Sequence, residues 1–80
     1  MKIYDFMGKK NICGERVKER RRQLGLSQEN LAARLQVEGI NIERDSISRI
    51  EIGTRFVADY ELVALCKILK VTPAFLLGIE

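Results

Sequence analysis

Glycines divide the chain into short segments, and the segments that they end carry apolar residues at helical spacing. Gly25, Gly39, Gly53 and Gly78 each follow a segment in which apolar residues recur three or four positions apart. Glycine readily adopts the left-handed conformation that ends many helices, so this placement predicts a succession of short helices. No strand-like alternation is longer than residues 40–42. The expected fold class is therefore all-α.

Five helices are expected from these patterns. They cover about residues 14–24, 28 to 36 or 37, 44–52, 59–69 and 73–77. Ser27 is a good N-cap for the second helix, and Glu29 favours the positive end of that helix. Thr72 followed by Pro73 is a typical start for the fifth helix. Residues 38–43 form a non-helical connector, in which Ile40 and Ile42 are expected to pack against the core.

Two charged residues fall on the apolar faces of predicted helices. Arg21 lies between Val17 and Leu24 on the first helix, and Glu51 lies four residues after Ile47 on the third. Burying a charge is costly unless it is paired, so the two side chains could pair with each other and join the two helices. Alternatively, each side chain could extend its charged end to the rim of the core.

The length and composition predict one small soluble domain. Eighty residues leave no room for a second core, and 46% apolar with 31% charged residues is a globular balance. No apolar run approaches the roughly 20 residues that a membrane span needs. The first six residues lack the apolar stretch of a signal peptide, so a cytoplasmic protein without membrane association is expected.

The residue types present argue against an enzyme. The chain has no histidine, which excludes Ser–His and Cys–His pairs and imidazole metal ligands. The two cysteines, Cys13 and Cys66, cannot form a four-ligand zinc site alone, and a disulfide is not expected in an unsecreted chain. We expect both to be buried or semi-buried free thiols, with no metal and no cofactor.

Positive charge is concentrated in the first third of the chain. Residues 1–25 hold eight basic and three acidic residues, whereas residues 26–80 hold six basic and eight acidic residues. Such asymmetry favours an anionic partner, with nucleic acid ahead of an acidic membrane surface. A solvated helix face is the plainer interpretation of the same charges.

Three blocks of sequence carry a recognisable pattern: RVKERRR with LGLSQENLA (residues 16–22 and 24–32), SISRIEIG (46–53), and LKVTP with LLG (69–73 and 76–78). In this order and spacing they resemble the helix-turn-helix domain of the Cro and lambda repressor type, the XRE-like regulators. The resemblance covers about four fifths of the chain, from Gly14 to Gly78. It implies a five-helix lambda repressor-like fold whose second and third helices form the helix-turn-helix. It also implies pairing of Arg21 with Glu51.

The resemblance implies that the third helix enters the major groove of double-stranded DNA. The positions that match base-reading residues of the family are Glu43, Arg44, Asp45, Ser46 and Arg49. Arg44 and Arg49 suit guanine, although a phosphate contact or a solvated side chain is the plainer alternative. Glu43 and Asp45 could accept a hydrogen bond from cytosine or could simply complement the helix dipole.

The resemblance also implies that a second group of residues contacts DNA phosphates. The group comprises Ser27 and Gln28 at the start of the second helix, Ser48 in the third helix, Thr54 and Arg55 after it, and Lys9 and Lys10. Gln28 could instead be merely solvated. The lysines, with Lys2, would belong to a basic N-terminal arm over residues 1–13, preceding the domain of residues 14–80. Short basic termini are, however, often disordered.

The chain departs from the family in the turn between the second and third helices. This turn usually has about three or four residues, and here it holds roughly five more, centred on residues 37–41. The longer loop could touch the DNA backbone, contact a partner, or simply be tolerated, because added loop length costs little. The longer loop leaves open the angle at which the third helix would lie in the major groove, and therefore which bases each residue would reach.

The expected function is that of a sequence-specific transcriptional regulator, more often a repressor, encoded by a bacterium or phage. Specificity from one small unit normally needs two copies on a pseudo-palindromic operator, so a homodimer is expected. The apolar candidates for its interface are Phe75, Leu76, Leu77 and Ile79, although at least two could simply close the core. The rival hypothesis is a protein-interaction module of the same fold, such as an antitoxin-like or anti-regulator partner.

Overall fold

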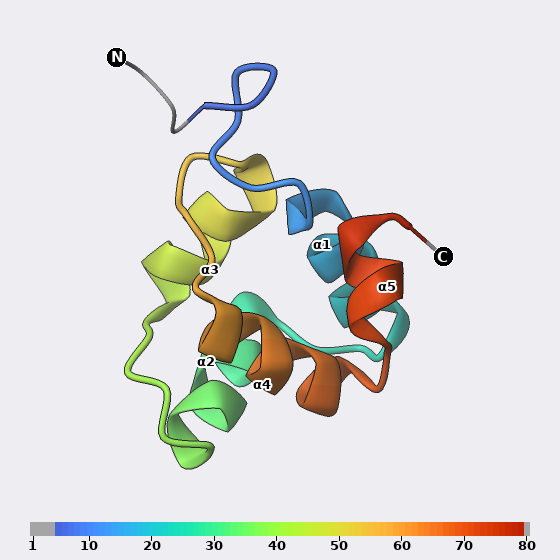
Figure 1. Cartoon of the computed structure of the whole chain (residues 1–80). Coiled ribbons are helices and arrows are strands. Elements are labelled where there is room, and N and C mark those ends of the chain that lie inside the picture. Colours follow the sequence, from blue (N-terminus) through green and yellow to red (C-terminus); the bar gives the residue numbers. More distant parts are fainter. Residues whose placement is uncertain (1–4, 80) are drawn as a thin grey trace.

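The computed structural model describes residues 5–79, and within this range it is all-α, as the sequence predicts. Five helices follow one another along the chain (Figure 1). They are α1 (Gly14–Gln23), α2 (Gln28–Val37), α3 (Arg44–Ile52), α4 (Asp59–Leu69) and α5 (Pro73–Leu77). The expected boundaries are confirmed to within a residue or so.

Local capping explains why the helices begin and end at these residues. The Ser27 hydroxyl accepts a hydrogen bond from the Asn30 N–H at 3.0 Å, and the Thr72 hydroxyl accepts one from the Phe75 N–H at 3.0 Å. Each cap satisfies an N–H that has no partner within its own helix. Gly53 ends α3 with a φ of 88°, a left-handed conformation that favours glycine.

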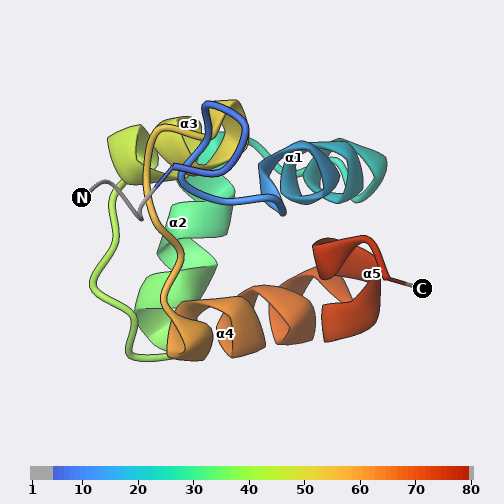
Figure 2. The ribbon, with the colours of Figure 1, turned by 45° about the horizontal axis from the view of Figure 1, so that its top comes forward.

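The helices enclose one apolar core. α1 packs against α3, α4 and α5, while α2 packs between α3 and α4 (Figure 2). The largest fully buried side chains are Val17, Leu31, Leu35, Ile47, Ile50, Leu65, Leu69 and Leu76. Burying one such side chain contributes about 1.5–3 kcal/mol relative to leaving it exposed. Side chains from all five helices share this core, which holds α2 and α3 against each other.

The lengthened turn is tied to the rest of the fold rather than free. The Ile40 N–H donates to the Leu35 carbonyl at 2.9 Å, and the Gln36 amide donates to the Ile42 carbonyl at 2.7 Å. Ile42 is 2% exposed and Ile40 packs against the core, which confirms that both isoleucines pack inward. The Glu38 carboxylate also pairs with Lys67 of α4 at 2.8 Å.

The residues just before α1 lie against the end of α3. Phe6 and Lys9 exchange backbone hydrogen bonds around a tight turn, and the Lys10 N–H then donates to the Gly53 carbonyl at 2.8 Å. Figure 1 shows this segment (blue) beside the C-terminal end of α3 (yellow). Lys2, the first lysine of the expected arm, lies outside the described residues.

Candidate nucleic-acid interface

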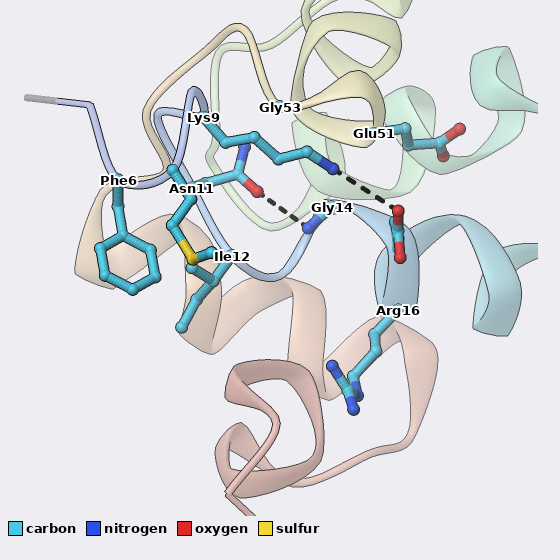
Figure 3. A pocket seen from close by; sticks show the side chains of 10 residues that line it. Phe6, Lys9, Asn11, Ile12, Gly14, Arg16, Glu51 and Gly53 are labelled. Carbon is cyan, nitrogen blue, oxygen red and sulfur yellow. Dashed lines mark hydrogen bonds and ion pairs between the residues drawn. The ribbon is translucent and has the colours of Figure 1, made fainter.

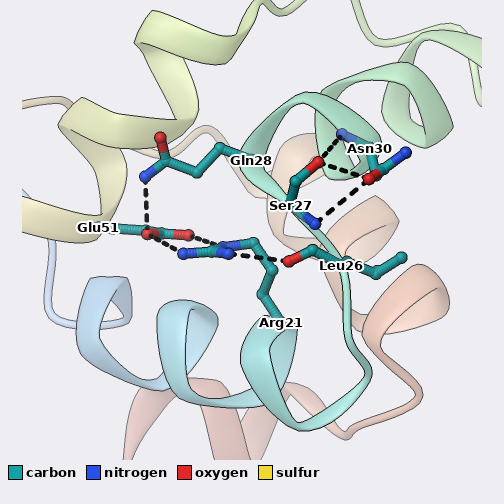
Figure 4. A network of polar contacts seen from close by, with 6 residues as sticks. All are labelled: Arg21, Leu26, Ser27, Gln28, Asn30 and Glu51. Carbon is teal, nitrogen blue, oxygen red and sulfur yellow. Dashed lines mark hydrogen bonds and ion pairs between the residues drawn. The ribbon is translucent and has the colours of Figure 1, made fainter.

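A buried ion pair joins α1 to α3. The Arg21 Nε donates to Glu51 Oε2 at 2.6 Å and Nη2 donates to Oε1 at 3.0 Å, while Nη1 donates to the Leu26 carbonyl at 2.8 Å (Figure 4). Arg21 is 8% exposed and Glu51 5% exposed. The pairing predicted from the sequence is present, and the alternative of two rim charges does not apply. The hydrogen bond to Glu51 raises the pKa of Arg21, so the guanidinium stays charged.

Gln28 extends this ion pair to the start of α2. Its side-chain amide donates to Glu51 Oε1 at 3.0 Å (Figure 4). In this structure Gln28 is therefore half-buried and partnered, not simply solvated. One carboxylate thus holds residues from α1 and α2 against the last turn of α3. Glu51 therefore links α2 to α3, the two helices of the helix-turn-helix.

A basic groove opens beside this network. It has a volume of about 590 Å³ and is lined by Lys18, Arg21, Arg22, Ser27, Gln28, Glu29 and Arg44. Four of these residues are cationic and one is anionic, and the groove lies at the N-terminus of α2. Backbone N–H groups and the helix dipole at such an end favour anions. Lys18 and Arg22 were not among the residues predicted to contact DNA, although their i, i+4 spacing on one exposed face of α1 is visible in the sequence.

The exposed side of α3 carries most of the expected base-reading residues. Arg44, Asp45, Arg49 and Glu43 are exposed, whereas Ser46 is half-buried. Arg44 and Asp45 form an ion pair at 3.0 Å with side chains 55% and 64% exposed. Pairing of this kind between exposed groups is weak, so Arg44 can exchange Asp45 for another partner. Ser48, expected at a phosphate, is half-buried.

The loop after α3 holds a charged contact that the sequence did not indicate. Arg55 donates from two nitrogens to the two carboxylate oxygens of Glu61, each at 3.0 Å. Glu61 is 6% exposed and also accepts from the Ala58 N–H at 2.9 Å. These hydrogen bonds, chiefly that of Arg55, hold the pKa of Glu61 below its usual value. Arg55 thus anchors the loop to α4, while Thr54 is exposed beside it.

Lys9 and Lys10 have partners within the chain. Lys9 lies 3.5 Å from Glu15, and Lys10 lies 2.9 Å from Asp5 and 5.2 Å from the centre of the Phe56 ring. Lys9 also lines a cavity of about 250 Å³ between the N-terminal segment and the start of α1 (Figure 3). Neither ion pair is buried, so each lysine can release its acidic partner for a phosphate.

The proposed dimer residues differ in their accessibility. Leu76 is fully buried in the core, so its side chain is not available to a second copy. Phe75 and Leu77 are half-buried, and Ile79 is 77% exposed. The prediction that Leu76 lies at a dimer interface is therefore wrong. α5 packs on α1 and α4, and Leu76 is the residue that it buries in the core.

Both cysteines are free and buried, as expected from the sequence. Burial is the main cause that raises the pKa of each thiol, so Cys13 and Cys66 stay protonated near neutral pH. Within residues 5–79 no cluster of His, Cys, Asp or Glu side chains could hold a metal ion. No helix in the same range is long and apolar enough to cross a membrane.

Comparison with known proteins identifies the class. The model of a helix-turn-helix domain family matches residues 13–76, which span α1 to α5 almost completely. The chain therefore belongs to the helix-turn-helix domain family, a class of DNA-binding domain. No curated protein and no solved structure matches the chain.

Proposed function

We propose that this protein is a sequence-specific transcriptional regulator that reads the major groove with α3. The observation that carries the proposal is the basic groove, because its lining brings together cations, the N-terminus of α2 and Arg44 of α3. Helix-turn-helix proteins dock in this way, with the first helix on the backbone and the second in the groove.

Phosphate contacts would fix the position of the domain on DNA. Gln28 and the N–H groups at the start of α2 would bind one phosphate, with Ser27 beside them. Lys18 and Arg22 would add positive charge along the same strand. Further phosphate contacts are assigned to a second group of residues, namely Ser48, Thr54, Arg55, Lys9 and Lys10. Of these, Arg55 must share its guanidinium with Glu61.

Base contacts would come from the N-terminal half of α3. Arg44 and Arg49 are assigned to guanine, whose O6 and N7 accept two hydrogen bonds from a guanidinium. Asp45, Glu43 and Ser46 are close enough in sequence to reach neighbouring bases. Their acidic groups would also oppose indiscriminate binding, because each carboxylate repels the phosphate backbone.

The small size of the domain suggests how it would act on DNA. A single unit of this size contacts few base pairs, so we propose a homodimer on a pseudo-palindromic operator, with Ile79 as the most accessible interface candidate. Repression by an operator that overlaps a promoter, in the cytoplasm of a bacterial or phage-infected cell, is the corresponding mode of action.

A fluorescence titration of the protein against random duplex DNA at two salt concentrations tests this proposal. Binding through several phosphates predicts that affinity falls steeply as salt rises, with a slope of about −0.9 per phosphate contacted. A Gln28→Ala variant should bind more weakly, and an exposed Glu19→Ala variant on α1 should not. Undetectable or salt-independent binding by the wild type would favour the protein-interaction module instead.

A further inference from the structure

Three backbone carbonyls around the end of α3 accept hydrogen bonds from the residues that precede α1. The Lys10 N–H donates to the Gly53 carbonyl at 2.8 Å. The side-chain amide of Asn11 donates to the Ile50 carbonyl at 3.1 Å and to the Arg55 carbonyl at 2.7 Å. The Ile50 carbonyl lies in the last turn of α3, where it has no partner within the helix and also accepts the Gly53 N–H at 3.1 Å, whereas the Gly53 and Arg55 carbonyls lie beyond the helix.

Asn11 uses both ends of its amide. Its Oδ1 accepts the Gly14 N–H at 2.8 Å (Figure 3). The same oxygen also lies 3.8 Å from the Cys13 thiol, which donates to it. One half-buried side chain therefore joins the start of α1, the last turn of α3 and the loop beyond it. An asparagine with both N–H donors engaged has little freedom to rotate.

Neighbouring contacts reinforce this arrangement. Lys9 packs so closely on Gly53 that a Cβ there would lie 2.9 Å from the lysine Cδ. Lys10 holds its ammonium 5.2 Å from the Phe56 ring centre. Residues 9–11 thus contact the loop of residues 53–56 at both of its ends. Thr54 and Phe56 are the exposed residues of this loop, and Thr54 belongs to a backbone segment that residues 9–11 contact on both sides.

We propose that Asn11 is a positioning residue for DNA binding. It acts through the carbonyls of Ile50 and Arg55 to set the loop of residues 53–56 and the end of α3 relative to α1. It does not itself touch DNA. The inference rests on the proposed DNA-binding function, because the loop matters to binding only if it meets a phosphate. A group that orients the contacting residues in this way should affect affinity without making a contact.

An Asn11→Ser variant separates positioning from helix capping. The serine hydroxyl can still accept the Gly14 N–H, but it cannot donate to the Ile50 and Arg55 carbonyls together. The matched control is Thr72→Ala, which removes the cap of α5 and does not alter the contacts of α3. Backbone amide NMR signals are recorded without DNA. Duplex binding is then titrated over a salt series at a temperature where circular dichroism shows all proteins folded.

In Asn11→Ser we expect the largest amide shifts at residues 53–56. DNA affinity should fall about tenfold, and the salt dependence should lose about one phosphate contact. Thr72→Ala should bind as the wild type does. Unmoved signals at residues 53–56, or wild-type affinity and salt slope in Asn11→Ser, would overturn the inference alone. A wild type that binds no DNA would instead refute the proposed function, and the inference with it.

Discussion

Replacing Glu51 by alanine is expected to lower the free energy of unfolding by about 3–5 kcal/mol. The substitution leaves the Arg21 guanidinium buried with only the Leu26 carbonyl and removes the partner of Gln28. A small domain is stabilised by only about 5–15 kcal/mol, so the variant should be largely unfolded at moderate denaturant concentration. Urea titration followed by circular dichroism measures the loss.

Two further variants identify the cause of that loss. Glu19→Ala removes an exposed carboxylate and should change stability by less than about 0.5 kcal/mol. The double variant Arg21→Met with Glu51→Leu should recover much of the stability, because it leaves no unpaired charge in the core. A loss below about 0.5 kcal/mol in Glu51→Ala would mean that the ion pair does not join the helices.

Replacing Gly14 by alanine is expected to destabilise the fold by about 2–3 kcal/mol. A Cβ at this position would lie 2.1 Å from the Ile50 carbonyl oxygen and 3.0 Å from that of Glu51. Both neighbours are backbone atoms of α3, so α1 must move away from the helix that the interface uses. The same urea titration measures the effect.

The control for Gly14 is a helical position with open surroundings. Ala33 is exposed within α2, and Ala33→Gly should cost about 1 kcal/mol through helix propensity alone. In an open helix, alanine therefore gives the higher free energy of unfolding. If alanine gives the lower free energy of unfolding at position 14, the steric clash with α3 is the cause. Wild-type or higher stability in Gly14→Ala would show that α1 and α3 are not in close contact there.

The helices could be predicted from the sequence because their signals are local. Ser27, Gly53 and the pair Thr72-Pro73 each act on residues within one or two turns, and the structure places helix ends there. Spacing alone places Arg21 and Glu51 on buried faces, where each charge needs a partner or must reach the rim of the core. Their pairing with each other follows from the family resemblance.

The surroundings of α3 could not be predicted in the same way. Asn11 contacts carbonyls 39 and 44 residues away, and a side chain-to-backbone contact over that distance leaves no pattern in the sequence. The residues before α1 therefore looked like a basic arm, whereas residues 9–11 lie against the end of α3. Arg55 is a similar case, because its bidentate ion pair with Glu61 depends on how the loop packs against α4.

The proposal that α3 reads base sequence is tested most directly by Arg44→Ala, measured on an operator obtained by selection from random duplexes. We predict a loss of about 1–3 kcal/mol in binding to that operator, with relaxed preference at one base position and little change on random DNA. A loss of equal size on every sequence would contradict the claim, because Arg44 would then contact only phosphate.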